Sequence, residues 1–195
     1  SMADCGRAAA DVLELEWEDC QVIWGDTSQN LPYSSVQAGS RTAHAHTRAN
    51  HAAGLDLKQK LQEIAAATLG GSANSYRTSR GRVSGPGGSI SFAQAAQRAI
   101  ELGGKYSGEV LPDDINQVTT ASATALAGQG VMGVAKDNFS HDGSTYSWVI
   151  GFAVVELDVE TGDVQIVDYT GSADCGVVLH PRSLGAQIHG GSVQG

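Results

Sequence analysis

The sequence contains few cysteines and no long apolar run, and each shortage excludes a class of protein. Cys5, Cys20 and Cys175 are odd in number among 195 residues and show no CxxC or Cys/His spacing, so neither a disulfide framework nor a zinc site is predicted. A reducing compartment is the simplest interpretation. No segment approaches the roughly 20 apolar residues of a membrane-spanning helix, and residues 1–16 lack the basic and apolar regions of a signal peptide. We therefore expect no membrane insertion.

Charge is also scarce, and most of it is negative. Charged residues make up 17% of the chain, and 21 Asp and Glu against 12 Lys and Arg give a formal net charge of −9. A surface of this sign repels phosphate backbones and anionic lipids. We therefore exclude nucleic acid and an anionic membrane surface as the main partners.

Several catalytic signatures are missing as well. The chain has no strand–GxGxxG–helix unit, no GxxxxGK[ST] loop and no GxSxG, which argues against nucleotide-binding enzymes and serine hydrolases. A small hydrolase that uses Cys175 is a weak alternative, because Asp174 and a glycine flank this thiol and no positive neighbour lowers its pKa. His44 and His46 point nearly opposite ways on a helix, so we interpret them as structural or solvated. The sequence predicts no catalytic residue and no metal ligand.

Glycine, by contrast, is abundant. The 25 glycines exceed the share of an average domain and indicate many turns and close backbone approaches. The apolar content of 41% is enough for a core. The length fits one domain, or two sub-domains, 1–72 and 73–195, that share a core.

Apolar residues at helical spacing predict three main helices. The first covers residues 4–16. The longest opens at Gly39–Thr42 and ends near Leu69, before a pair of glycines that is typical of a helix C-terminus. A third begins at the capping box Ser91–Gln94 and reaches Leu102, with Phe92, Ala96 and Ile100 buried. One or two further turns are expected within residues 120–127.

Strands are predicted between these helices. We expect strands over residues 21–26 and 130–136, a short hairpin over 74–91 and a long hairpin from Trp148 to Gly176. In the long hairpin apolar and acidic residues alternate, which predicts one buried face. The loop after residue 136 contains Asp137, His141 and Asp142, which we interpret as turn residues. The mixed order of elements predicts an α+β fold with layered helices on mixed sheets.

The start of the longest helix is the most informative local feature. A helix N-terminus offers N–H groups and partial positive charge, and Gly39 lets a ligand approach the backbone. Ser40 and Thr42 are candidate N-caps, and Arg41 adds a bidentate donor for phosphate oxygens. Cations at spacings of three and four continue along the same side. This arrangement predicts an anion site that prefers phosphate; the alternative is a capped surface helix with solvated side chains.

The long hairpin delivers Asp174, Cys175 and Gly176 to the end of a strand, ahead of a glycine-rich tail. Scaffolds present polar side chains and bare backbone to ligands at such positions. The alternative is an ordinary hairpin followed by a flexible tail.

Several stretches resemble one family of enzymes. Residues 174–195, DCGVVLHPRSLGAQIHGGSVQG, closely resemble a motif in the large subunit of the xanthine dehydrogenase/aldehyde oxidase family of molybdenum hydroxylases. The hairpin sequence FAVVELDVETGDVQIVDY and residues 22–42, which end in GSRT, are similar to the corresponding family segments. So are residues 89–108 and 126–139. The resemblance covers nearly the whole chain, and the motif at 174–195 is its specific part.

This resemblance implies a molybdenum-cofactor-binding domain. Family members carry molybdopterin, in bacteria often as a dinucleotide such as the cytosine form, and hydroxylate aldehydes or N-heterocycles with oxygen from water. Electrons leave through iron–sulfur clusters. The resemblance places Gly39, Ser40, Arg41 and Thr42 against the pterin or its phosphates. It also places Gln187 near the metal, and its amide can both donate and accept hydrogen bonds.

The departures from the family pattern shape the expected function. The resemblance puts the catalytic glutamate in a segment that would come after residue 195, and cofactor-covering glycine segments ahead of residue 1; His180 stands where asparagine is common. We therefore expect a partial molybdopterin-binding domain over 1–195 that is inactive alone. The alternative is a stand-alone binding or assembly module without cofactor.

The same resemblance implies the partners. We expect the remainder of the large subunit, an iron–sulfur subunit and, in some members, a flavin subunit. A cytoplasmic location is expected, with the periplasm left open for the intact enzyme. Because removing one part of a larger core exposes apolar surface, we also expect self-association.

Overall fold

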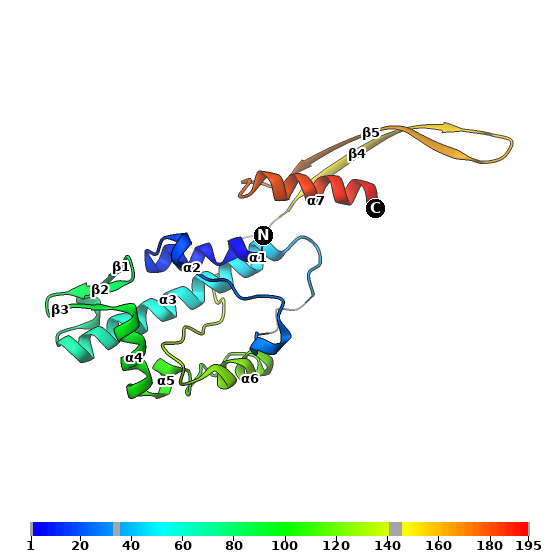
Figure 1. The fold of residues 1–195 in the computed structure, drawn as a ribbon. Coiled ribbons are helices and arrows are strands. Elements are labelled where there is room, and N and C mark those ends of the chain that lie inside the picture. The colour runs from blue at the N-terminus through cyan, green and yellow to red at the C-terminus, as the bar shows by residue number, and fades with distance from the viewer. Residues whose placement is uncertain (1, 33–35, 141–145, 195) are drawn as a thin grey trace. The chain divides into compact units, whose positions relative to one another are not determined.

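A computed structural model describes residues 2–32, 36–140 and 146–194. The chain divides into two compact units, Ser1–Phe139 and Ser140–Gly195 (Figure 1). The boundary considered at residue 72 lies inside the first unit. Helices and small antiparallel sheets occur together, which confirms the α+β class. None of the helices in the described ranges is both long and apolar enough to cross a membrane.

The first unit is built on the helix α3 (Thr42–Leu69), which has the predicted length. It ends at Gly70, whose φ of 85° suits glycine and whose N–H donates to the carbonyl of Ala66 at 2.8 Å. The predicted helix 4–16 is divided into α1 (Met2–Cys5) and α2 (Arg7–Leu13). It stops at Leu13 because Glu14 adopts a left-handed conformation.

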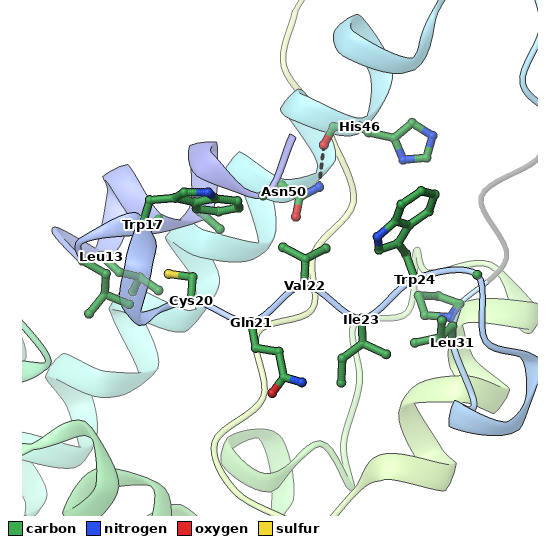
Figure 2. A pocket seen from close by; sticks show the side chains of 16 residues that line it. Leu13, Trp17, Cys20, Gln21, Val22, Ile23, Trp24, Leu31, His46 and Asn50 are labelled. Atoms are coloured by element: carbon green, nitrogen blue, oxygen red, sulfur yellow. Dashed lines mark hydrogen bonds between the residues drawn. The ribbon is translucent and has the colours of Figure 1, made fainter. Parts of the chain in front are cut away.

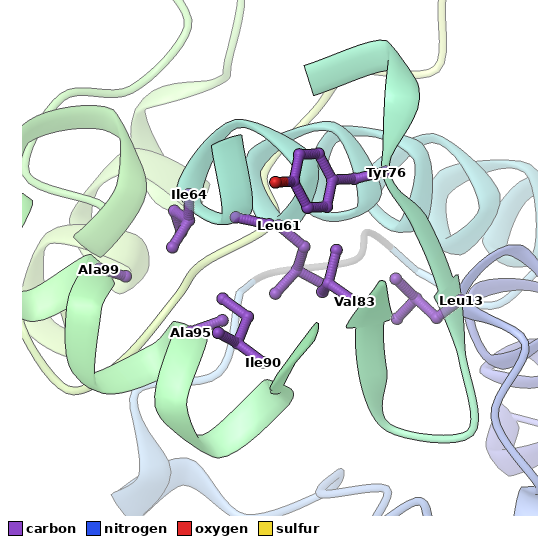
Figure 3. Close-up of a cluster of buried hydrophobic side chains, with 9 residues drawn as sticks. Leu13, Leu61, Ile64, Tyr76, Val83, Ile90, Ala95 and Ala99 are labelled. Atoms are coloured by element: carbon purple, nitrogen blue, oxygen red, sulfur yellow. The ribbon is translucent and has the colours of Figure 1, made fainter. Parts of the chain in front are cut away.

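A three-stranded antiparallel meander packs against α3 (Figure 3). It follows a 3-10 turn, Ala73–Ser75, and consists of β1 (Arg77–Ser79), β2 (Arg82–Gly85) and β3 (Gly88–Ser91). The expected hairpin over 74–91 was therefore one strand short, because the Pro-Gly-Gly sequence forms a second turn instead of ending the sheet. The core combines the inner face of the meander with neighbouring helices; its buried members are Leu13, Leu61, Ile64, Ala65, Tyr76, Val83, Ile90, Ala95 and Ala99.

The helix α4 (Phe92–Leu102) confirms the predicted capping box. The N–H of Gln94 donates to Ser91 Oγ at 3.1 Å, and Gln94 Oε1 accepts from the N–H of Ser91 at 2.8 Å. The predicted buried face was wrong in part: Phe92 packs against the core as expected, but Ala95 and Ala99 are the buried residues and Ile100 is 39% exposed. Two shorter helices follow, α5 (Gly104–Ser107) within the expected connection and α6 (Gln117–Leu126) where helical turns were predicted.

Two predicted strands are wrong. Residues 21–26 form an irregular segment between the 3-10 turns Trp17–Asp19 and Thr27–Gln29. Residues 130–136 are irregular as well, and pair with no strand within the described chain. Instead they lie along α3, where Lys60 Nζ donates to the carbonyl of Met132 at 2.9 Å and the N–H of Val134 donates to Asp56 Oδ2 at 2.8 Å. Side chains of α3 thus replace the missing strand partner.

The second unit contains the predicted long hairpin, formed by β4 (Trp148–Leu157) and β5 (Val164–Asp174). At its reversal Asp158 accepts hydrogen bonds from the N–H groups of Glu160 and Thr161 at 2.8 and 3.2 Å. The expectation of one buried face was wrong, because every residue of β4 is exposed. Most of the glycine-rich tail forms the helix α7 (Pro181–Gln194).

Candidate functional site

The loop that leads into α3 has the open backbone that an anion site needs. Gly39 and Ser40 have φ values of 61° and 52°, and nothing lies within 4 Å of the position that a Cβ on Gly39 would take. The N-cap residue is Arg41, which makes no side-chain cap hydrogen bond. The predicted caps Ser40 and Thr42 were therefore wrong by one position. Residues 36–41 of the loop are exposed, and the side chain of the N-cap residue does not cap the N–H groups of the first turn of α3.

Side chains hold this loop in place from within. Arg41 Nη2 donates to the carbonyl of Val36 at 2.8 Å, and Thr42 Oγ1 donates to Gln37 Oε1. The amide nitrogen of Gln37 lies 3.1 Å from His46 Nε2. The bond to the carbonyl of Val36 orients the Arg41 guanidinium at the helix start. The first turns of α3 and the loop therefore form one preorganised set of donors.

The next cation along α3 is neutralised by a residue that sequence reasoning missed. Arg48 Nε and Nη2 donate to the carboxylate of Asp137 at 2.6 and 3.0 Å, and Nη2 also donates to the carbonyl of Phe139 at 2.8 Å. The hydrogen bond to Asp137 raises the pKa of the Arg48 guanidinium. Asp137 is thus a partner of α3 as well as the predicted turn residue, because its Oδ1 also accepts from the N–H of Phe139 at 3.1 Å. The other two predicted turn residues, His141 and Asp142, lie outside the described residues.

A largely apolar pocket of about 540 Å³ adjoins the same half of α3 (Figure 2). Residues of α2, Trp17, residues 20–25, Leu31 and Pro32 line it, and His46 and Asn50 of α3 add polar groups at one wall. Asn50 Nδ2 donates to the carbonyl of His46 at 2.8 Å. An anion would gain little from the aliphatic and indole surfaces here, so the groups suited to phosphate are those of the loop before α3.

Histidines give no metal site in this region. His44 and His46 lie on α3 as expected, two residues apart. In the part of the chain that the structure describes, no three His, Cys, Asp or Glu side chains gather closely enough to hold a metal ion.

The remaining predicted residue belongs to the second unit. Gln187 lies on α7 and is exposed. Gly190 and Gly191 follow on the same helix, with nothing within 4 Å of their Cβ positions. Ahead of α7, the N–H of Gly176 donates to Asp174 Oδ1 at 3.0 Å, and Cys175 is an exposed free thiol. Gly39, Ser40 and Arg41 thus lie in the loop before α3, and Thr42 is the first residue of that helix. Contact of these four residues and of Gln187 with one cofactor stays a prediction.

Comparison with known proteins decides the family. A family model described as a molybdopterin cofactor-binding domain matches residues 4–195. The chain belongs to this family. As a molybdopterin-binding domain it is 29% identical over 189 residues to the nicotine 6-hydroxylase large subunit of Paenarthrobacter nicotinovorans. It is 25% identical over 189 residues to the probable hypoxanthine oxidase XdhD of Escherichia coli K12.

These relatives are much longer proteins. The alignments cover 97% and 96% of this molybdopterin-binding domain, but only 21% and 17% of the two relatives. The resemblance to molybdenum hydroxylases that the sequence motifs indicated is thereby confirmed. The donors before α3 also fit a phosphorylated pterin chemically, because open glycine backbone, a helix N-terminus and a guanidinium all favour phosphate oxygens.

Proposed function

We propose that this domain is the part of a molybdenum hydroxylase large subunit that holds the phosphate and pterin of the cofactor. The intact enzyme would hydroxylate an aldehyde or an N-heterocycle with oxygen derived from water. One observation carries the proposal for the site. The loop before α3 combines positive φ values at Gly39 and Ser40 with an oriented guanidinium at Arg41.

Each residue of this loop has its own role in the proposal. Gly39 lets the ligand approach the main chain, since any larger side chain there would be strained at a φ of 61°. Arg41 supplies charge and paired donors to a phosphate oxygen. The N–H groups at the start of α3 add the positive end of a 28-residue helix. Molybdenum on the bound pterin would supply the oxygen-transfer chemistry, and this domain would bind and orient the cofactor.

Gln187 completes the proposed set of contacts. Its amide has both donor and acceptor atoms, so it suits a position beside oxygen ligands of the metal. We further propose that the cofactor is the cytosine dinucleotide form and that the isolated domain has no hydroxylase activity. Iron–sulfur and flavin subunits would be the electron-accepting partners.

The test replaces one donor and measures the cofactor directly. Large subunit carrying Arg41→Gln would be purified from a molybdopterin-producing host, and released pterin would be quantified by its fluorescence after oxidation. Because a hydrogen bond to a charged group contributes about 1.5–3 kcal/mol, we expect the affinity for pterin to fall about tenfold or more, and the pterin content of the purified subunit to fall with it. The matched control is Arg77→Gln, which replaces an exposed arginine of β1. Its pterin content should equal that of the wild type.

Three results would each contradict part of the proposal. A wild-type pterin content in the Arg41→Gln variant would show that the loop does not bind the cofactor phosphate through Arg41. Absence of pterin and molybdenum from wild-type subunit would favour the alternative, a stand-alone module without cofactor. Substrate-dependent dye reduction by the isolated domain would refute the expected inactivity.

A further inference from the structure

The two strands of the long hairpin differ in where their polar side chains lie. Cross-strand partners share a face in an antiparallel ladder, and the register sets Ala153 opposite Tyr169 and Phe152 opposite Thr170. The face that contains Ala153 carries no charged side chain on either strand. Its members are Val149, Gly151, Ala153, Val155 and Leu157 on β4, and Ala173, Gly171, Tyr169, Ile166 and Val164 opposite them.

On the other face, β4 carries apolar side chains and β5 carries polar ones. From Trp148 to Val154, β4 contributes only large apolar side chains, each at least 57% exposed. The β5 residues opposite are all polar, and two of them are aspartates. The pairs are Trp148–Asp174, Ile150–Ser172, Phe152–Thr170 and Val154–Asp168. Over this length β4 is apolar on both faces, whereas β5 is apolar on one.

These patterns are typical of two different positions in a sheet. A strand covered on both faces has a nearly continuous apolar sequence, whereas an edge strand carries charges that discourage further pairing. By this criterion β4 has the sequence of an interior strand and β5 that of an edge strand. Yet β4 pairs on one side only within the described residues, and a lone two-stranded hairpin is marginally stable in water.

We propose that β4 is an interior strand of the intact large subunit, paired along its second edge by a strand from the rest of that polypeptide. This inference rests on the proposed function. The occupant follows from length, because the domain spans only 21% of the nicotine 6-hydroxylase large subunit and most of such a polypeptide lies outside it. The incoming strand has apolar residues on both faces, since its neighbours on β4 are apolar on both. β5, with Asp168 and Asp174, remains the edge.

Hydrogen exchange distinguishes an interior strand from an edge strand. A strand paired on one side directs about half of its N–H groups away from its partner, whereas an interior strand bonds nearly all of them. In the intact large subunit, mass spectrometry of a peptide spanning β4 should show nearly all amides protected, and a peptide spanning β5 about half. Protection of only about half of the β4 amides would overturn the proposal.

A pair of lysine substitutions provides a second, independent test. Ile150 and Ser172 lie directly opposite on the same face, so Ile150→Lys and Ser172→Lys place the same charge at the same height on different strands. We expect Ile150→Lys to lower the melting temperature and soluble yield of the large subunit, and Ser172→Lys to change neither. Equal effects of both variants would contradict an interior position for β4.

Two further readouts separate this inference from its alternatives. Protection of β4 that rises with protein concentration would show that a second copy of the chain is the occupant, which refutes the proposal. Pterin is measured on the same sample. Bound pterin with β4 half exchanged refutes only this inference, whereas a fully protected β4 without pterin refutes only the proposed function.

Discussion

Lys60 provides a quantitative test of how the segment 131–135 is held on α3. Its side chain is nearly buried, with the residue 5% exposed, and its ammonium lies 2.6 Å from Asp56 and 2.9 Å from the carbonyl of Met132. Lys60→Met retains much of the apolar stem but removes the charge and the donor. Asp56 then loses its ion partner, and the carbonyl of Met132 loses its hydrogen bond.

The expected loss of stability follows from these two contacts. Breaking a fully buried ion pair costs about 3–5 kcal/mol. Because the Asp56 side chain is 25% exposed, water solvates its carboxylate in part and reduces this cost. A fully buried carbonyl left without its hydrogen bond costs about 1–3 kcal/mol, and the half-buried carbonyl of Met132 lies at the lower end of that range. We therefore expect Lys60→Met to lower the free energy of unfolding by about 2–3 kcal/mol.

The assay is urea unfolding followed by circular dichroism at 222 nm, which reports on α3. The matched control is Lys58→Met, the same substitution two residues away on α3, where the partner Glu14 lies 3.9 Å from the ammonium and is largely exposed. Exposed pairs contribute about 0–1 kcal/mol, so the control should stay close to wild type. Equal stability of the two variants would refute the structural role assigned to Lys60.

Two further predictions concern the same unit. Gly133→Ala should lower the melting temperature of the unit, because a Cβ on Gly133 would lie 2.5 Å from the carbonyl oxygen of Ala53. Gly130→Ala should leave it unchanged, because a Cβ there would make only an ordinary contact at 3.8 Å. Equal melting temperatures of the two variants would contradict the close packing of Gly133 on α3. Burial acts to raise the pKa of Glu63, but hydrogen bonds, chiefly from Lys105, outweigh it and lower that pKa from 4.5. Glu63 therefore stabilises the fold above its unfolded pKa and loses this effect as pH falls through the folded pKa. The difference in free energy of unfolding between wild type and Glu63→Gln, measured by urea titration, should shrink as pH falls below about 4.5. A difference that stays unchanged would contradict a stabilising ion pair between Glu63 and Lys105.

Elements fixed by local chemistry could be predicted from the sequence. The C-terminus of α3 at Gly70 and the capping box at Ser91 depend on a few adjacent residues, and both were found as expected. The buried face of α4 was misplaced by one residue, because alanines of equal character occupy neighbouring positions. Ala95 and Ala99 face the core only because the meander lies on that side.

Features that depend on distant partners could not be predicted. Residues 130–136 have the composition of a strand, but a strand needs a partner, and Asp56 and Lys60 satisfy the backbone groups instead. Asp137 lies 89 residues from Arg48 in sequence, so no local pattern reveals their ion pair. In the candidate site, the open backbone at Gly39 was predictable from glycine alone, whereas the bond from Arg41 to the carbonyl of Val36 was not.

We propose that the loop before α3 and the amide of Gln187 contact one and the same phosphorylated pterin. The most direct measurement is a crystal structure of the cofactor-loaded large subunit. We predict that Arg41, the N–H groups beside Gly39 and the Gln187 amide all lie within hydrogen-bond distance, about 2.7–3.2 Å, of a single cofactor molecule. A structure in which packed side chains separate Arg41 from Gln187, with the pterin touching neither, would contradict the account.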